Sequence, residues 1–508
     1  MTRRSTTAIV IALLATPTAV NADALESALA LQKAFEEAID KVEPSIACIL
    51  VSRSDVYQRW FGQTYSASDP GRLGEFHSGS VSLRVPPGDE ERIDALRRQL
   101  AKKLGMPIQR VTLAMLFDLS QPGYVPESYG SGVVIDANGL ILTNYHVVRG
   151  ARKIFVRLPG EIGSYADIYG ADPRSDLAVL RLLDGRVGPL KPIRFGDGGK
   201  VKKGHLVLSI ANPFAAGFRD GSPSASWGMI SNVRRRHPGV SVWEQDRAKW
   251  TIHDFGTLLQ ADPRLNLGCS GGALINLKGE MIGLTTALAA ISNSETAGGY
   301  AFPLDDVLKR IIGVLAQGKE VNYGFLGVRL ETQQNSTQVQ VLRHSAAERG
   351  GIRNGDTILA IDDVPIRDSE DLFYHIGTKL AGNQARIKLR SINGIVRTVT
   401  VTLDKFYVPG PFIAANKPKP VFGLRVDYTS VLCQRTGLAE VPVGVYVSEV
   451  VPGSPADRAR LQDAVIVKVN GKLVTNPDEF YRAVGDGPVV LSVVDHNEPG
   501  GLRTIKFN

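Results

Sequence analysis

The pattern of apolar positions changes character along the chain. Between residues 24 and 42, apolar side chains recur at helical spacing with Glu and Lys between them, and Pro44 ends the predicted helix. A second amphipathic helix is predicted from Glu90 to Leu104, with Asp89 as its N-cap. This helix lies inside residues 53–128, which otherwise show no regular period and resemble an insertion.

From Gly130 onward the pattern is typical of strands. Short apolar runs are bounded by Asn, Gly, Asp and Pro as far as Phe302. They predict an antiparallel β domain of barrel or sandwich type, closed by a helix over residues 303–315. The 52 glycines among 508 residues fit the many tight turns of such a domain.

Two later segments repeat one order of elements. Residues 339–363 and residues 445–471 each contain a strand, a short segment that includes Ser and Ala, a second strand and a polar turn. The offset between them is about one hundred residues, the size of a small domain. The proline-bearing residues 408–420 separate the two copies and are typical of a linker.

The N-terminus has the pattern of a targeting segment. Arg3 and Arg4 precede an apolar run of 13 residues, Ala8–Val20, which contains Pro17. A membrane-spanning helix needs about 20 residues, so this run predicts a secretory signal peptide instead. Cleavage after Ala22 would leave an exported, soluble protein, located in the periplasm of a bacterium with two membranes.

Composition and charge exclude several classes of protein. Hydrophobic residues make up 43% and charged residues 22%, which argues against a disordered chain, a fibre or a polytopic membrane protein. The net charge is +8, but basic residues are interspersed and their densest run is Arg234–Arg236, so nucleic-acid binding is not expected. Three cysteines cannot form a disulfide scaffold. The eight histidines show no metal-ligand spacing, so neither a metal nor a cofactor is expected.

Three short motifs carry the candidate chemistry. His146 lies in Thr-Asn-Tyr-His-Val-Val after a predicted strand, Asp176 in Asp-Pro-Arg-Ser-Asp-Leu-Ala, and Ser270 in Gly-Cys-Ser-Gly-Gly. Each alone fits a structural role: a packed histidine, a turn aspartate, or a glycine-rich turn. Together they provide a base, an orienting acid and a nucleophile.

The three residue types complement one another chemically. A serine hydroxyl is a weak nucleophile until an imidazole accepts its proton. The imidazole in turn needs a carboxylate at its other nitrogen, which fixes the tautomer and stabilises the imidazolium. Glycines beside Ser270 allow backbone N–H groups to converge on the oxyanion of a tetrahedral intermediate. The motifs therefore predict acyl transfer at a Ser-His-Asp site.

In this order and spacing, the motifs resemble the HtrA (Deg) family of serine proteases. The resemblance covers most of the chain from about Phe35 and is densest around the three motifs. It implies a mainly β protein, in which a chymotrypsin-like double β-barrel protease domain precedes two PDZ domains, each a small α+β barrel. By resemblance, His146 is the general base, Asp176 orients it, and Ser270 attacks the scissile carbonyl. The amides of Gly268 and Ser270 would form the oxyanion hole.

The resemblance also implies domain limits and partners. In the first PDZ domain, Gly324, Phe325, Leu326 and Gly327 would form the loop whose amides bind a peptide C-terminus, so that the ligand adds a strand. The second PDZ domain is a poorer match and is expected to pack or regulate. Unfolded or misfolded proteins would be the substrates, and a homo-oligomer, a trimer or larger, is expected.

The expected limits are a signal peptide at 1–22, the protease domain at 23–320 with the insertion 53–128, PDZ domain 1 at 321–406, a linker at 407–420, and the PDZ-like domain 2 at 421–508.

One departure from the family concerns the residue before the nucleophile. Cys269 stands where the family usually has Asn. A buried side chain that fills this space is one interpretation. The other is a thiol whose oxidation would tilt the flanking amides and slow the enzyme.

Two functions other than proteolysis are compatible with parts of the sequence. Gly-Cys-Ser-Gly-Gly also fits the nucleophile turn of α/β-hydrolases, but these enzymes order their triad Ser, Asp, His, and here His146 and Asp176 precede Ser270. The second alternative is a proteolytically weak or inactive chaperone or PDZ scaffold on a protease fold. The intact triad argues against it, although this family is known to have resting states.

Overall fold

The structure is a computed structural model of the 508-residue chain. It describes residues 22–53, 90–111, 119–120, 128–185, 187–235, 251–263, 265–286, 299–330, 336–485, 487–494 and 501–507. The predicted signal peptide and most of the insertion 53–128 lie outside these residues. Within them, no helix is both long and apolar enough to cross a bilayer.

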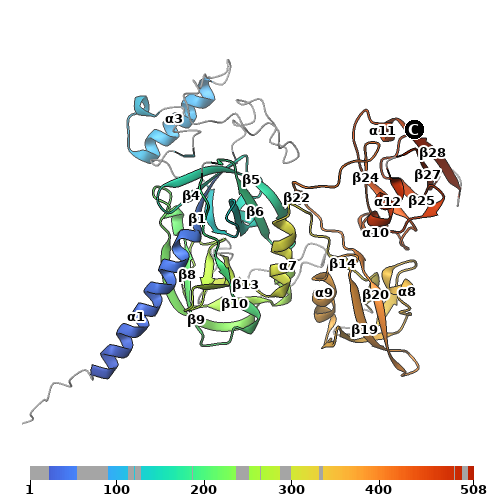
Figure 1. Ribbon diagram of the computed structural model, residues 1–508, viewed down its shortest axis with the longest axis horizontal. Coiled ribbons are helices and arrows are strands. Elements are labelled where there is room, and N and C mark those ends of the chain that lie inside the picture. Colours follow the sequence, from blue (N-terminus) through green and yellow to red (C-terminus); the bar gives the residue numbers. More distant parts are fainter. Residues whose placement is uncertain are drawn as a thin grey trace, which may run out of the picture.

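The two helices predicted from the N-terminal pattern are confirmed. Helix α1 spans Ala22–Val42 and α3 spans Glu90–Leu104. The C-terminal part of α1 buries Ala38 and Val42 against the protease domain, whereas Leu25 near its start is 54% exposed. Figure 1 accordingly shows α1 extending from the body of the molecule.

The predicted β domain consists of two closed six-stranded barrels. In the first, the strands pair in the order β5-β4-β1-β2-β3-β6, and a further pairing of β5 with β6 closes the ring. Every pairing in this ring is antiparallel. The strands are β1 (Ile46–Ser52), β2 (Ser128–Val134), β3 (Leu140–Asn144), β4 (Lys153–Leu158), β5 (Ile162–Asp172) and β6 (Leu177–Leu182).

The second barrel has the same construction. Its strands pair in the order β11-β8-β9-β10-β13-β12, closed by β11 with β12, and β7 (Arg194–Phe195) adds to β12 in parallel. One apolar cluster includes Leu142 of the first barrel and Phe302 of the second, so the two barrels share a continuous core. The strands are β8 (Leu206–Ala211), β9 (Ser224–Arg235), β10 (Leu258–Ala261), β11 (Ala273–Ile275), β12 (Glu280–Thr286) and β13 (Gly299–Pro303).

Helix α7 (Asp306–Leu315) closes this domain as the sequence predicts, but it begins three residues later than expected because Pro303 ends β13. Asp305 caps it by accepting a hydrogen bond from the amide of Leu308 at 2.9 Å. One face buries apolar side chains in the shared core, each of which stabilises the fold by about 1.5–3 kcal/mol. These side chains are Leu308, Ile311, Ile312 and Leu315.

The two repeated segments lie in domains with separate cores, and most of their elements follow the same order. In both, a serine caps the short first helix: Ser345 caps α8 and Ser454 caps α11. The second domain has one additional helix, α10 (Thr429–Thr436). The first comprises β14 (Gly324–Phe325), β15 (Val328–Leu330), β16 (Val339–Val341), α8 (Ala346–Arg349), β17 (Thr357–Ile361), β18 (Val364–Pro365), α9 (Ser369–Gly377), β19 (Gln384–Arg390), β20 (Val396–Thr402) and β21 (Asp404–Lys405). The second comprises β23 (Leu424–Tyr428), β24 (Val445–Val450), α11 (Pro455–Arg458), β25 (Val465–Val469), β26 (Lys472–Leu473), α12 (Pro477–Val484), β27 (Val489–Val494) and β28 (Leu502–Phe507).

The predicted linker is more ordered than its proline content indicates. Its strand β22 (Ile413–Ala414) pairs antiparallel with the outer strand β5, with Ile413 opposite Ala171. The Asn416 amide then donates to the carbonyl of Gly318 at 2.8 Å. The linker therefore adds a strand to the first protease barrel before the second domain begins (Figure 1).

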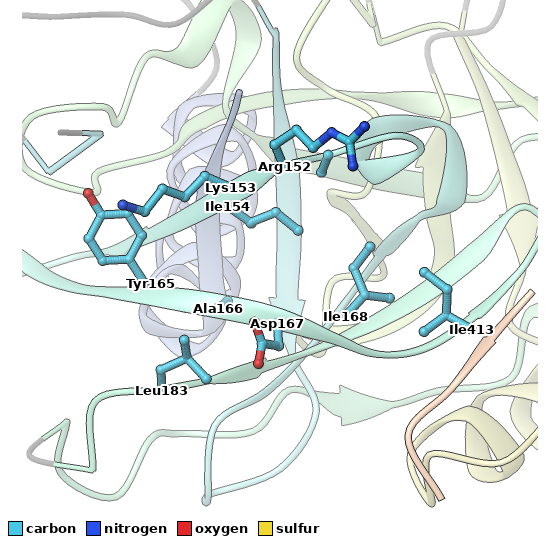
Figure 2. Close-up of a pocket in the computed structure, with 10 residues that line it drawn as sticks. Arg152, Lys153, Ile154, Tyr165, Ala166, Asp167, Ile168, Leu183 and Ile413 are labelled. Carbon is cyan, nitrogen blue, oxygen red and sulfur yellow. The ribbon is translucent and has the colours of Figure 1, made fainter. Parts of the chain in front are cut away.

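A small pocket lies where the linker strand meets the barrel. Figure 2 shows that this pocket is lined by Asp167 of β5 and by apolar side chains that include Ile154, Ile168, Leu183 and Ile413 of the linker. Burial raises the pKa of Asp167 to about 6, and the cross-strand neighbour Arg181 opposes this shift. The ionised carboxylate is therefore poorly accommodated at neutral pH.

We expect Asp167→Asn to stabilise the protein at pH 8 but not at pH 4. A carboxyl whose pKa is raised in the folded state is more easily ionised in the unfolded chain. Its ionisation therefore lowers the free energy of unfolding as the pH rises from about 4 to 6, and the loss persists above that range. Because the carboxyl is partly hydrated, we expect the substitution to raise the free energy of unfolding at pH 8 by about 1 kcal/mol. Urea unfolding of both proteins at the two pH values measures the difference, and equal unfolding free energies at pH 8 would contradict this account.

Candidate active site

His146 lies at the end of a strand of the first barrel. Strand β3 ends at Asn144, and the chain continues into the one-turn helix α5 (Tyr145–Val148). The carbonyl oxygen of Asp176 accepts hydrogen bonds from the Tyr145 amide at 2.9 Å and from the Asn144 side-chain amide at 3.2 Å. The turn that carries Asp176 therefore holds the backbone that carries His146.

Asp176 occupies the turn between β5 and β6. Its φ of 52° lies in the left-handed region, which is unfavourable for a residue other than glycine. One carboxylate oxygen accepts the His146 amide at 2.9 Å, and the other lies 2.7 Å from His146 Nδ1. Because an ionised carboxylate only accepts hydrogen bonds, Nδ1 carries the proton and Nε2 has the free lone pair.

Ser270 lies in a turn that only glycine-rich sequence can form. Gly268 and Gly271 have φ values of 95° and 85°. A Cβ on Gly271 would lie 2.1 Å from the carbonyl oxygen of Ser131, and one on Gly268 would lie 2.5 Å from that of Asn212. The backbone amide of Ser131 in β2 donates to the Ser270 carbonyl at 2.8 Å, and its hydroxyl donates to the Gly268 carbonyl at 2.7 Å. The first barrel thus holds the serine loop of the second.

The amides of Gly268 and Ser270 are expected to form the oxyanion hole. Each belongs to a peptide group whose carbonyl oxygen accepts a hydrogen bond from elsewhere in the domain. The Leu267 carbonyl accepts the Phe214 amide at 2.7 Å, and the Cys269 carbonyl accepts the Thr285 hydroxyl at 2.6 Å. In a trans peptide the N–H points opposite to the C=O. The N–H groups of Gly268 and Ser270 therefore point away from Phe214 and Thr285.

The structure brings the three motifs to the junction of the barrels. Val147 and the carbonyl oxygen of Ser270 both border Gly130, so the histidine helix and the serine loop meet across β2. The contact between His146 and Asp176 is made. His146 Nε2 is buried and has no hydrogen-bond partner among the described residues, so it makes no hydrogen bond with Ser270 here. Such bonds often tighten only when substrate binds.

Cys269 is 3% exposed, and burial raises the pKa of its thiol to about 11. The reactive form of cysteine is the thiolate, which is scarce at neutral pH under these conditions. The structure favours the space-filling interpretation of Cys269 over the redox one.

A buried polar cluster that sequence reasoning missed connects the Asp176 turn to the first PDZ domain. One oxygen of Asp172 accepts the Ser175 amide at 2.9 Å, the Ser175 hydroxyl at 2.5 Å and the Tyr323 hydroxyl. Burial raises the pKa of Asp172, and these hydrogen bonds oppose the shift. The Arg174 guanidinium lies over the rings of Phe406 and Tyr323, at 4.0 and 5.0 Å.

The expected carboxylate loop of the PDZ domain begins directly after Tyr323. Gly327 has a φ of 80°, and a Cβ there would lie 2.2 Å from Ser345 Cβ. The Leu326 carbonyl accepts a hydrogen bond from the Ala347 amide at 2.8 Å, whereas the Gly324 amide donates to the backbone carbonyl of Lys379 at 2.7 Å. The Gly324 amide therefore already has a partner within the domain.

Comparison with known proteins agrees with this architecture. Residues 130–284 match the family described as trypsin-like peptidase domain, and residues 324–403 match the PDZ domain. A probable periplasmic serine endoprotease, DegP-like, from Ectopseudomonas mendocina (strain ymp) is 31% identical over 386 residues, which cover 72% of this chain and 76% of that protein. The periplasmic pH-dependent serine endoprotease DegQ of Escherichia coli (strain K12) is 29% identical over 395 residues, with 74% and 80% covered.

Among solved structures, the HtrA-type protease AlgW with decapeptide is 23% identical, covers 74% of this chain and 99% of that chain, and has a TM-score of 0.47. The double barrel, the PDZ domain and the 31% identity over most of both chains agree. This chain therefore belongs to the HtrA/Deg family of serine endoproteases.

Proposed function

We propose that this enzyme cleaves unfolded or misfolded proteins with Ser270 as nucleophile, His146 as general base and Asp176 as the carboxylate that orients His146. The observation that carries the proposal is the 2.7 Å contact between Asp176 and His146 Nδ1, which leaves Nε2 free to accept a proton. Both side chains lie at the barrel junction that also holds Ser270.

The reaction would follow the chemistry of acyl transfer. Ser270 Oγ attacks the scissile carbonyl while His146 Nε2 takes its proton, and the amides of Gly268 and Ser270 bind the oxyanion. The imidazolium then protonates the leaving amine, and an acyl-enzyme remains. Water, deprotonated by His146, attacks this ester and releases the acid and Ser270.

The proposed location is the periplasm. The apolar run Ala8–Val20 has the length of the apolar region of a signal peptide, and the relatives named above are described as periplasmic. Self-association fits the exposed apolar side chains of the second barrel and its loops, which include Phe214 at 59%, Trp227 at 62% and Met229 at 44%. We propose a homo-oligomer, a trimer or larger.

The first PDZ domain is proposed to bind peptide C-termini at Gly324–Gly327 and to gate proteolysis. Tyr323 precedes this loop and donates to Asp172, four residues before Asp176, so a shift of the loop can reach the triad. A ligand shifts such an equilibrium only if it binds the two states with different affinity.

The PDZ-like domain 2 is proposed to pack and regulate rather than to bind peptides. Lys405, 5% exposed, contacts Glu320 and Asp427 at 2.7 Å each and so joins the protease–PDZ connection to the second domain. The Ser430 hydroxyl of α10 donates to the Lys405 carbonyl at 2.8 Å.

Casein digestion with two matched peptides tests this function. We expect slow hydrolysis by the protein alone and at least several-fold faster hydrolysis with a hydrophobic peptide that ends in a free carboxylate. The amidated twin should activate weakly, because it lacks the charge that the loop amides would bind.

Equal activation by both peptides would contradict docking of the carboxylate. Absence of hydrolysis under every condition would favour the scaffold alternative, for which the unpartnered His146 Nε2 is the one supporting observation.

A further inference from the structure

A buried histidine, His253, contacts the turn that carries Asp176. His253 is part of the short 3₁₀ helix η7 (Ile252–Phe255) and is 4% exposed. Its ring lies flat on Phe302, with centroids 3.5 Å apart and an interplanar angle of 2°. We propose that His253 is a positioning residue that holds Asp176 in its working orientation. This inference rests on the proposed function, because it assumes that Asp176 acts on His146.

The hydrogen bonds of His253 define its tautomer. Nε2 lies 2.8 Å from the carbonyl oxygen of Ser175, which can only accept, so Nε2 carries the proton. Nδ1 lies 3.4 Å from Thr257 Oγ1, whose hydroxyl can donate to it. Burial lowers the pKa of His253 to about 4, against the opposing influences of the Ser175 carbonyl and the Asp176 carboxylate. The ring is therefore a neutral, fixed donor at neutral pH.

The bonded carbonyl belongs to the peptide that immediately precedes Asp176. Asp176 has a left-handed φ, which persists only where the surroundings hold the backbone. Asp172 holds Ser175 through its amide and hydroxyl, and Tyr145 binds the carbonyl of Asp176. His253 is the contact that holds the Ser175–Asp176 peptide by its oxygen, and this peptide determines where the Asp176 carboxylate points.

The same short helix touches the first PDZ domain. Phe255 of η7 lies 6.4 Å, centroid to centroid, from Tyr374 of α9, and the Ile252 amide donates to the Arg174 carbonyl at 2.9 Å. Helix η7 therefore lies between α9 and the Asp176 turn, and His253 is its contact with the peptide of the triad aspartate.

Three substitutions in the full-length protein test the inference. His253→Ala removes the donor, His253→Gln offers an amide that reaches the Ser175 carbonyl, and His253→Asn has the same polarity but is one methylene shorter. His205→Gln, at an exposed position, is the matched control. Hydrolysis of a fluorogenic peptide gives kcat, KM and the pH profile, and circular dichroism and thermal unfolding report the fold.

We expect kcat of His253→Ala to fall about tenfold to a hundredfold with KM near that of the wild type, as is typical when a supporting hydrogen bond to a site residue is lost. A displaced Asp176 stabilises the imidazolium less, so we expect the acid limb of kcat/KM to move to lower pH. His253→Gln should regain part of kcat and His253→Asn should not.

Several results would overturn the inference. These are wild-type kcat and pH profile in His253→Ala, equal activities of the Gln and Asn variants, or a loss of activity that only follows loss of folded protein. If His253→Ala does not fold, the comparison of Gln with Asn decides. A wild-type protein without Ser270-dependent hydrolysis would contradict the proposed function itself, and the inference would fall with it.

Discussion

Replacing Ser270 with alanine is expected to lower kcat by about 10⁴- to 10⁶-fold, because the variant lacks the hydroxyl that we propose forms the acyl-enzyme. Ser270 is 4% exposed, and its backbone carbonyl is held by Ser131. Removing one oxygen leaves these backbone contacts intact. The variant should therefore keep its fold and its affinity for PDZ ligands.

Casein digestion, thermal unfolding and peptide binding measure these three properties separately. Ser226→Ala, at an exposed position on β9, is the matched control and should digest casein at the wild-type rate. Casein digestion by Ser270→Ala at a comparable rate would exclude Ser270 as the nucleophile.

For Asp176→Asn we expect a fall of about 10⁴-fold in kcat at neutral pH, since the imidazole would adopt the wrong tautomer. The structure determines which way the new amide would face. The backbone amide of His146 donates to one carboxylate oxygen at 2.9 Å, so the asparagine oxygen would occupy that position. Its NH₂ group would then face Nδ1, which would have to accept, and the proton would move to Nε2. His146 could no longer act as a base.

Asp220→Asn is the matched control for this substitution. Asp220 is exposed and also accepts a backbone amide, that of Ser222, at 3.0 Å. We expect wild-type kcat for the control and unchanged thermal unfolding for both variants. A kcat for Asp176→Asn within tenfold of the wild type would show that Asp176 does not orient His146.

Features encoded by local pattern could be predicted from the sequence. The helical spacing of residues 24–42 and 90–104 and the strand runs from Gly130 onward correspond to elements of the structure. The motifs of His146 and Asp176 predict a contact that the structure contains. In these cases a short stretch of chain carries most of the information.

Features that depend on contacts between distant residues could not be predicted in this way. Tyr323 and Asp172 are 151 residues apart, and His253 and Ser175 are 78 apart. Neither Tyr323 nor His253 lies in a motif that marks it as a partner of the triad loop. Strand β22 has only two residues in a proline-bearing segment, so no period of two could reveal it. In such cases the tertiary context determines the role of the residue.

The linker strand also determines how far the last domain can travel. If all residues between Lys405 and Leu424 were free, their contour length would be about 65 Å. With Asn416 fixed to the protease domain, only the eight steps to Leu424 can extend, which is roughly 28 Å at about 3.5 Å per residue. The PDZ-like domain 2 would therefore stay within a short tether of the first barrel, at a high effective concentration for packing against the protease domain.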